Sequence, residues 1–282
     1  MKDISLPKFE FPSKGEIDIA KEEIFSGSGM YIFKSVIKKL DALKIQNFLL
    51  MHNSNIFKKV SSKGNHRLFF YPESPYWHPP FIEFLWEKIC NVRNSVYEDQ
   101  EWFENYKERH GLRGQSLSDV LNFQRKHSWA SFFWYKNADT HFRHIDGPGE
   151  LACFLVLSEK GQDYKEGGLY LYKDENDQEG VLADDNYNFG DLVVFDQSRV
   201  WHEVKNLVID DRLGRFQFYV PNIPDGRIND FFAFEGSKKV YFSKKTNLFK
   251  KIHIQLNHLF NKSETHYSRK SVKYNEKVPP KF

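Results

Sequence analysis

Uninterrupted runs of apolar residues recur along the chain between residues 129 and 220. Short apolar runs bounded by glycine and polar turn residues are typical of strands that are buried on both faces. The predicted strands include residues 132–135, 151–157, 166–171, 190–195 and 212–220. Several of the 27 phenylalanines fall in these runs, where aromatic side chains are favoured. The sequence therefore predicts a mainly β core with aromatic packing.

The first half of the chain carries apolar residues at helical spacing. A strand at residues 29–34 is followed by predicted helices at 35–51 and 79–97, the second introduced by a pair of prolines. Residues 101–128 are charged and predicted to be partly helical, whereas residues 1–28 are expected to be an irregular lead-in. Helices are thus expected to flank the β core.

The polar segment 172–189 separates two of the predicted strands. Its composition predicts a solvated hairpin connection, with a gate over a substrate as the alternative. Asp184 and Asp185 within it are not interpreted as a second metal site.

His144, Asp146 and His202 are the candidate metal ligands. Side chains alternate between the two faces of a strand, so His144 and Asp146 are expected to point to one ion. Phe142 is expected on the same face of the strand. The glycines and proline of residues 147–149 end this strand beside the site. His202 follows a predicted buried strand and supplies the third ligand. Two histidines and one carboxylate leave open positions on an octahedral ion, which is typical of non-haem Fe(II) oxygenases.

A chance occurrence of the H-x-D spacing is the alternative, because the chain has 11 histidines. A structural zinc site would have four ligands, usually including cysteine. The two cysteines, Cys90 and Cys153, have neither metal spacing nor a disulfide framework. Cys153 is expected to be a small buried apolar residue.

Further motifs follow in order around the three ligands. They are Tyr135 nine residues before His144, the apolar strand Leu151–Leu157, the Glu-Gly-Gly-Leu-Tyr-Leu of residues 166–171, the Gly-Asp-Leu-Val-Val-Phe of 190–195, the His-Glu-Val of 202–204, and Arg212 ten residues after His202. This series resembles the Fe(II)- and 2-oxoglutarate-dependent dioxygenases, most closely the prolyl 4-hydroxylase-like branch. The resemblance covers residues 130 to 220.

The resemblance implies a double-stranded β-helix, or jelly roll, with Fe(II) on His144, Asp146 and His202. It also implies 2-oxoglutarate as cosubstrate, O2, release of succinate and CO2, and ascorbate as an accessory reductant. A buried carboxylate of the cosubstrate needs a charged partner, and this role falls to Arg212, with Tyr135 as a second contact. Strand alternation places Arg212 with Gly214 and Phe216, and Arg215 on the opposite face is the rival.

One position departs from the family. Many prolyl 4-hydroxylase-like members have a second tyrosine three residues before the first iron histidine, where this chain has His141. The carboxylate Asp146 argues against the halogenating relatives, in which a small residue stands there. The resulting expectation is a hydroxylase of an unactivated C–H bond in a small metabolite, such as an amino acid, a sugar or a natural-product intermediate.

Three other functions remain as alternatives. One is a protein-residue hydroxylase of the prolyl type, and another is a non-catalytic jelly-roll protein that binds a metal as a sensor. The third is a zinc hydrolase with Glu203 as base, although alternation points that side chain away from His202.

The chain has a net charge of +3 that is unevenly distributed. Residues 227–282 carry 13 Lys and Arg against 4 Asp and Glu, whereas residues 1–226 carry 28 against 34. The predicted domains are therefore a dioxygenase domain at 1–226, with its jelly-roll core at 129–226, and a basic, partly helical extension at 227–282. A helix at 247–260 is expected to pack on the barrel or at a homodimer interface, with an acidic surface as the alternative partner.

The remaining expectations concern location and partners. The N-terminus lacks the apolar stretch of a signal peptide, and no run is long enough to span a bilayer. We expect a cytoplasmic protein that acts on a small molecule and has no nucleic-acid-binding motif.

Overall fold

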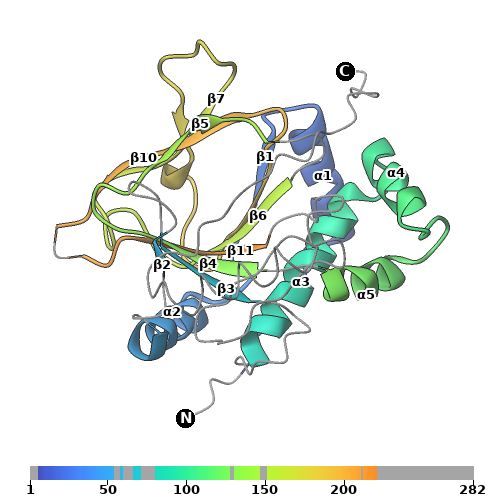
Figure 1. The fold of residues 1–282 in the computed structure, drawn as a ribbon, viewed down its shortest axis with the longest axis horizontal. Coiled ribbons are helices and arrows are strands. Elements are labelled where there is room, and N and C mark those ends of the chain that lie inside the picture. Colours follow the sequence, from blue (N-terminus) through green and yellow to red (C-terminus); the bar gives the residue numbers. More distant parts are fainter. Residues whose placement is uncertain are drawn as a thin grey trace, which may run out of the picture.

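Two antiparallel sheets face each other in the computed structural model (Figure 1). The structure describes residues 6–53, 58–59, 66–70, 80–127, 130–146, 151–210 and 212–220. The strands are β1 Met30–Phe33, β2 Lys58–Lys59, β3 His66–Phe70, β4 Ala130–Tyr135, β5 His141–His144, β6 Leu151–Val156, β7 Glu166–Tyr172, β8 Val181–Leu182, β9 Leu192–Asp196, β10 Trp201–Val208 and β11 Arg215–Val220. The helices are α1 Lys14–Phe25, α2 Lys39–Asn53, α3 Pro80–Tyr97, α4 Glu101–Arg109 and α5 Leu117–His127.

Strands β4 to β11 form a jelly roll. The larger sheet contains the order β9-β6-β11-β4, and the smaller sheet has the order β5-β10-β7-β8. The chain therefore passes back and forth between the two sheets, and strands distant in sequence, such as β4 and β11, become neighbours. This arrangement of eight strands in two packed sheets is that of a jelly roll, so the predicted fold class is confirmed.

Three strands before the jelly roll widen the larger sheet. Strand β1 pairs with β9 at one edge, and β3 pairs with β4 at the other, with β2 beyond it. The strand predicted at 29–34 is confirmed as β1, whereas β2 and β3 were not expected.

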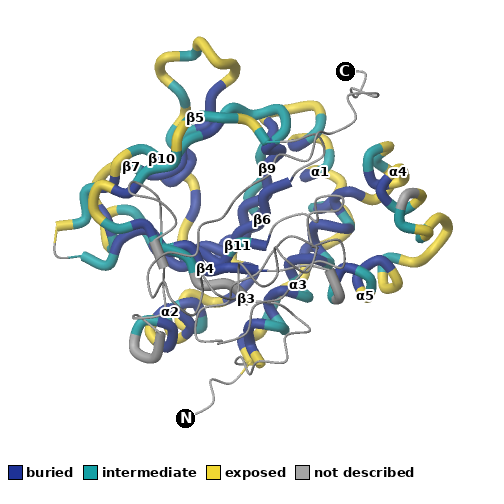
Figure 2. The backbone as a smooth tube through the Cα atoms, in the orientation of Figure 1, coloured by how far each residue is buried: buried dark blue, intermediate teal, exposed yellow. Residues whose placement is uncertain are grey.

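Each face of the larger sheet belongs to a separate apolar core. One core lies between this sheet and the helices, and it contains Phe132, Phe216 and Phe218 together with Leu85 and Ile89 of α3. The other core lies between the two sheets, and its members alternate with those of the first along the strands, as in Phe133, Phe154 and Phe195. Figure 2 shows this burial along the central strands and along α3. The helices thus cover the outer face and leave the inner face to the site.

The helices differ from the predictions at the N-terminal end. Helix α1 lies in the segment expected to be irregular, and it begins after Ser13, whose side chain accepts a hydrogen bond from the Glu16 amide at 3.2 Å. Its apolar side faces the core through Ile17, Ala20 and Ile24. Helix α2 begins at Lys39 rather than at residue 35, and residues 101–128 contain two helices, α4 and α5.

The segment 172–189 is less solvated than predicted. It includes β8 and a short 3-10 helix, Ala183–Asp185, and the side chain of Asp184 is buried. The two cysteines are free and buried, as expected for Cys153.

Part of the prediction lies outside the described residues. This holds for the C-terminal extension at 227–282, for its expected helix and for residues 221–226 of the predicted core. Among the residues that the structure describes, no helix combines the length and the apolarity needed to cross a membrane.

The start of β7 depends on Gly167. Its φ is +84°, and a Cβ there would lie 2.2 Å from the carbonyl oxygen of Asn206, where β10 has an irregular register opposite β7. Gly161 has a similar φ of +89°, but a Cβ there would meet nothing within 4 Å. Alanine at Gly161 therefore meets only the cost of the left-handed backbone conformation, whereas alanine at Gly167 also meets the cost of a clash.

We expect Gly167→Ala to lower the free energy of unfolding by more than Gly161→Ala does. The left-handed conformation alone costs an alanine about 1–2 kcal/mol, and the backbone of Asn206 adds a clash that no side-chain movement relieves. Urea denaturation of both variants measures the difference. Equal losses would show that β7 can move away from β10 without cost.

Candidate metal centre

The three predicted ligands meet at one end of the smaller sheet. His144 ends β5, and the pairing of β5 with β10 places His202 directly opposite it. Asp146 lies two residues beyond His144 and is fixed by its own amide, which donates to the carbonyl of Gln197 at 2.7 Å. The Nε2 atoms of the two histidines each lie 3.8 Å from a carboxylate oxygen of Asp146. Within the described residues, this is the group of three or more His, Cys, Asp or Glu whose ligand atoms can share one ion.

Backbone carbonyls orient both imidazoles. The Nδ1 atom of His144 lies 2.7 Å from the carbonyl oxygen of Phe142, and Nδ1 of His202 lies 3.0 Å from that of Val200. An acceptor at this distance holds the proton on Nδ1 and leaves the lone pair on Nε2, the atom that faces Asp146. Both side chains are thus set up to bind a metal through Nε2.

The site also favours neutral histidine. Burial, followed by the neighbouring His144, lowers the pKa of His202 to about 4. Neutral imidazole is the form that ligates a metal, so His202 needs to lose no proton on binding near neutral pH.

A β-bulge changes the face on which the neighbours of His144 lie. Between the pairs His202 with His144 and Val204 with His141, strand β5 contains one residue more than β10. The strict alternation that predicted Phe142 on the ligand face is therefore broken, and Phe142 is 69% exposed. The rings of His141 and Phe142 lie at nearly the same distance from that of His144, 4.7 and 4.8 Å between ring centres. Phe142 thus lies next to His144, but the bulge shifts the alternation by one residue and leaves the side chain mostly exposed.

Arg215, and not Arg212, enters the space between the sheets. The guanidinium of Arg212 donates to the carbonyl of Gly161 at a partly exposed position before β11. The face that alternation assigned to Arg212 is that of Phe216, which belongs to the core under the helices. Arg215 is buried on the inner face, next to Tyr135 in the β4–β11 pair. The structure thus does not bring Arg212 to the triad, and the rival residue lies inside.

The inner face of β11 continues from Arg215 towards the triad with polar side chains. Arg215 Nη1 donates to Gln217 Oε1 at 2.6 Å, and the Tyr219 hydroxyl donates to Gln197 Oε1 at 3.1 Å. Gln197 Nε2 in turn lies 3.4 Å from His202 Nε2. These residues were not singled out from the sequence, although alternation from Arg215 selects Gln217 and Tyr219. Gln217 thus contacts the arginine, and Tyr219 contacts Gln197 beside His202.

Tyr135, which the prediction paired with Arg212, lies beside Arg215. It is buried, and the guanidinium of Arg215 lies 5.5 Å from the centre of its ring. Phe154 flanks the guanidinium at the same distance. Aromatic rings on two sides restrict the positions that the Arg215 side chain can adopt.

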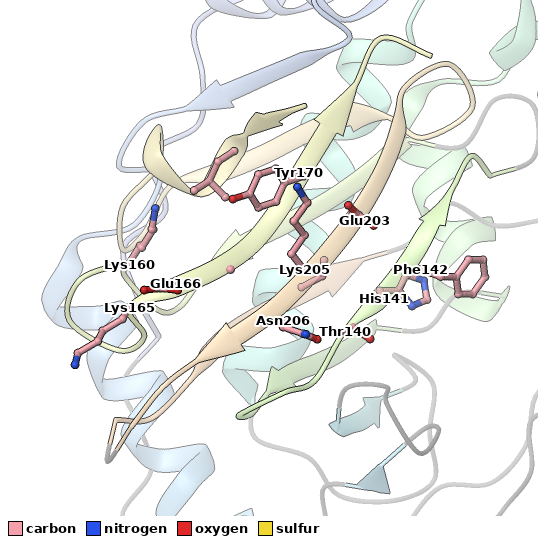
Figure 3. A pocket seen from close by; sticks show the side chains of 13 residues that line it. Thr140, His141, Phe142, Lys160, Lys165, Glu166, Tyr170, Glu203, Lys205 and Asn206 are labelled. Atoms are coloured by element: carbon pink, nitrogen blue, oxygen red, sulfur yellow. The ribbon is translucent and has the colours of Figure 1, made fainter. Parts of the chain in front are cut away.

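A separate hollow of about 640 Å³ lies on the outer face of the smaller sheet (Figure 3). Its lining includes Tyr170 of β7 and Glu203, Val204 and Lys205 of β10, and it includes none of the three ligands. The Glu203 carboxylate accepts a hydrogen bond from the hydroxyl of Tyr172. Its outward position agrees with the prediction that Glu203 points away from the metal site.

Comparison with known proteins gives matches among solved structures. No protein-family model matches the chain, and no curated protein matches it. A prolyl-4-hydroxylase of Pseudomonas putida is 15% identical and has a TM-score of 0.48, over 73% of this chain and 96% of its own. The non-haem α-ketoglutarate-dependent carbocyclase SnoK from nogalamycin biosynthesis is 11% identical and has a TM-score of 0.46, over 87% of this chain and 98% of its own.

Proposed function

We propose that the chain is an Fe(II)- and 2-oxoglutarate-dependent oxygenase of the prolyl 4-hydroxylase-like branch. The observation that carries this proposal is the convergence of His144, Asp146 and His202, with both Nε2 atoms facing one carboxylate. The jelly-roll fold and the order of motifs around the triad support it.

The donor set fits ferrous iron better than structural zinc. Two imidazoles and one carboxylate form a set that leaves coordination positions for other molecules, whereas structural zinc sites are closed by four protein ligands. Among the described residues, the group contains three potential ligands and no cysteine. Bound iron would activate O2 in a reaction that converts 2-oxoglutarate to succinate and CO2 and hydroxylates an unactivated C–H bond.

Arg215 is the proposed partner of the distal carboxylate of 2-oxoglutarate, in place of Arg212. It is buried on the inner face and shares its β11 face with polar residues that lead towards His202. The guanidinium of an arginine offers a carboxylate charge-assisted hydrogen bonds. Tyr135, next to Arg215 across the β4–β11 pair, is the proposed second contact.

The other interior residues exclude water and hold the reactants in place. Arg215, Gln217 and Tyr219 form a polar strip on the inner face of β11. Apolar surface surrounds this strip, and it comes from Phe133, Phe154, Phe195 and Leu171. The low dielectric that results strengthens the charge interactions of the strip. The ring of Phe195 lies 5.2 Å from that of His202 and limits how the imidazole can turn. These residues preserve geometry while the bound groups react.

The proposed substrate is a small metabolite that is hydroxylated or otherwise oxidised. His141, at the place of the family's second tyrosine, supports a substrate other than a prolyl residue. Hydroxylation of a protein residue is the second candidate, and a metal-binding sensor without turnover is the third. The compartment proposed for the enzyme is the cytoplasm, where reducing conditions keep iron ferrous.

Anaerobic titration of the Fe(II)-loaded protein with 2-oxoglutarate tests the function. Chelation of ferrous iron by the 2-oxo acid gives a weak metal-to-ligand absorption band in the visible, and candidate metabolites that bind nearby shift it. Absence of the band with stoichiometric iron bound would contradict the cosubstrate assignment. A band without succinate formation in air would favour the sensor.

We expect His144→Ala to lower the affinity for Fe(II) by more than about 100-fold and to abolish turnover. Even residues that only orient a metal ligand change metal affinity by roughly 10–100-fold. His110→Ala, in the connection after α4, removes a histidine away from the triad and controls for adventitious binding. Anaerobic Fe(II) titration of both variants checks the expectation. Unchanged iron affinity in His144→Ala would remove this residue from the site.

We expect Arg215→Lys to raise the 2-oxoglutarate concentration required for half-maximal succinate formation by about 10–100-fold. Lysine keeps the charge but lacks the planar fork, and a hydrogen bond to a charged group contributes roughly 1.5–3 kcal/mol. Arg212→Lys is the matched control and should leave the requirement unchanged. The reverse pattern would restore the role to Arg212.

A further inference from the structure

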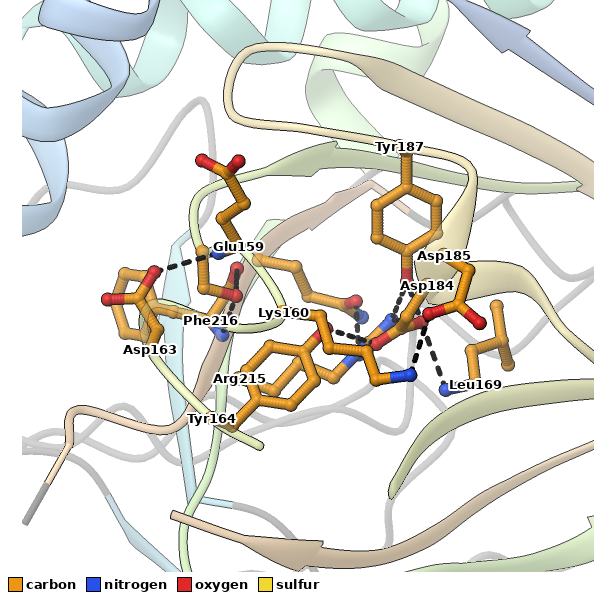
Figure 4. A network of polar contacts seen from close by, with 12 residues as sticks. Glu159, Lys160, Asp163, Tyr164, Leu169, Asp184, Asp185, Tyr187, Arg215 and Phe216 are labelled. Atoms are coloured by element: carbon orange, nitrogen blue, oxygen red, sulfur yellow. Dashed lines mark hydrogen bonds and ion pairs between the residues drawn. The ribbon is translucent and has the colours of Figure 1, made fainter. Parts of the chain in front are cut away.

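Arg215 already has a buried counter-ion within the barrel, Asp184. Nε of Arg215 lies 2.8 Å from Oδ2 of Asp184, and the two side chains are 3% and 0% exposed. Asp184 comes from the short 3-10 helix that follows β8, the edge strand of the smaller sheet (Figure 4). The ion pair therefore links β11 of the larger sheet to the segment that follows β8. A buried arginine without such a partner would carry an uncompensated charge, which is strongly destabilising.

Three further donors hold the carboxylate of Asp184 in place. The hydroxyls of Tyr164 and Tyr187 both donate to it, and the amide of Leu169 donates at 3.0 Å. Burial raises the pKa of Tyr164 and of Tyr187 well above the ordinary value for tyrosine, so both remain protonated donors. These three hydrogen bonds fix the Asp184 carboxylate independently of its contact with Arg215.

The backbone of β7 leaves space for this carboxylate. Gly168 has a φ of +113°, and a Cβ there would lie 2.4 Å from Oδ2 of Asp184. The second glycine of the Glu-Gly-Gly motif thus allows the approach of Asp184 to the inner end of the sheet. Any larger residue at this position would occupy the place of the carboxylate.

The three nitrogens of the Arg215 guanidinium face two sets of partners. Nε and Nη2 donate to the two carboxylate oxygens of Asp184 at 2.8 and 3.5 Å, and Nη2 also donates to the Tyr187 hydroxyl at 2.8 Å. Nη1 donates to Gln217 Oε1. Gln217 is the next inward residue of β11 in the direction of Tyr219 and the triad. Asp184 and Tyr187 therefore hold the side of the guanidinium opposite to the one that points along β11.

We propose that Asp184 is a positioning residue and a built-in competitor that sets the carboxylate affinity of Arg215. This inference rests on the proposed function and concerns the same site. Asp184 turns the Nη1 edge of Arg215 towards the triad and compensates its charge when no other anion is present. An incoming carboxylate then meets an arginine that is well placed but already neutralised, so it binds more weakly than it would to Arg215 alone.

Asp184→Asn tests the competition, because asparagine keeps the size and one acceptor oxygen but removes the charge. We expect it to bind 2-oxoglutarate roughly tenfold more tightly than the parent protein, within the usual range of coupling between neighbouring groups. Calorimetric titration of the anaerobic, Fe(II)-loaded protein measures this. The same titration of metal-free protein with succinate reports on Arg215 without chelation to iron.

Asp185→Asn is the matched control. Asp185 is the next residue, its side chain is 58% exposed, and it pairs with Lys160 rather than with Arg215. It should leave both affinities unchanged. A tightening of the same size in Asp185→Asn would mean that the effect comes from net charge and would overturn the proposal.

Thermal denaturation covers the case in which Asp184→Asn is too unstable to titrate. The variant should unfold at a lower temperature than the parent, and succinate should raise its unfolding temperature by more than it raises that of the parent. Equal or smaller gains, or equal affinities in the titration, would overturn the role of Asp184. If the parent itself binds no 2-oxoglutarate, the proposed function fails instead.

Discussion

The pairing of β5 with β10 is the constraint on which the candidate site depends. It places His144 opposite His202, which is far from it in the sequence, and brings Asp146 next to both. The carbonyl oxygens of Phe142 and Val200 then fix the imidazole rings from the same two strands. Ligand position and ligand orientation therefore arise from one antiparallel pair, and the rest of the jelly roll serves to hold that pair against the larger sheet.

The larger sheet contributes a polar strip to an otherwise apolar interior. Its two faces are divided by alternation, so that Phe216 packs under the helices while Arg215 and Gln217 face the triad. Polar groups on this inner face are satisfied by one another, as in the contacts of Arg215 with Asp184 and Gln217. Such networks inside a low dielectric have few alternative arrangements, which suits the proposed binding of 2-oxoglutarate in one orientation.

Sequence reasoning found His144 and Asp146 because their spacing is a local property of a strand, and it found His202 from the motif that follows the predicted strand at 190–195. The sequence also contains a signal for α1, which was not predicted: Ser13 and Glu16 have the spacing of a capping box. Sequence reasoning expected the face of Arg212 and Phe216 to be the inner face of β11, but packing against the helices makes it the outer face. The bulge beside His144 and the burial of Asp184 in a polar segment are consequences of tertiary contacts, and no periodicity in the sequence indicates them.

The proposed function would explain the buried pair of Asp184 and Arg215 by binding rather than by stability. Replacement of a buried ion pair by apolar residues of similar volume is often neutral or stabilising, and the surrounding Phe154 and Tyr135 show that apolar surface is available here. A pocket for an anion, however, has to remain folded both with and without its ligand. An internal carboxylate that compensates the arginine in the empty state meets this requirement, and it does so at the expense of the affinity that an uncompensated arginine would have.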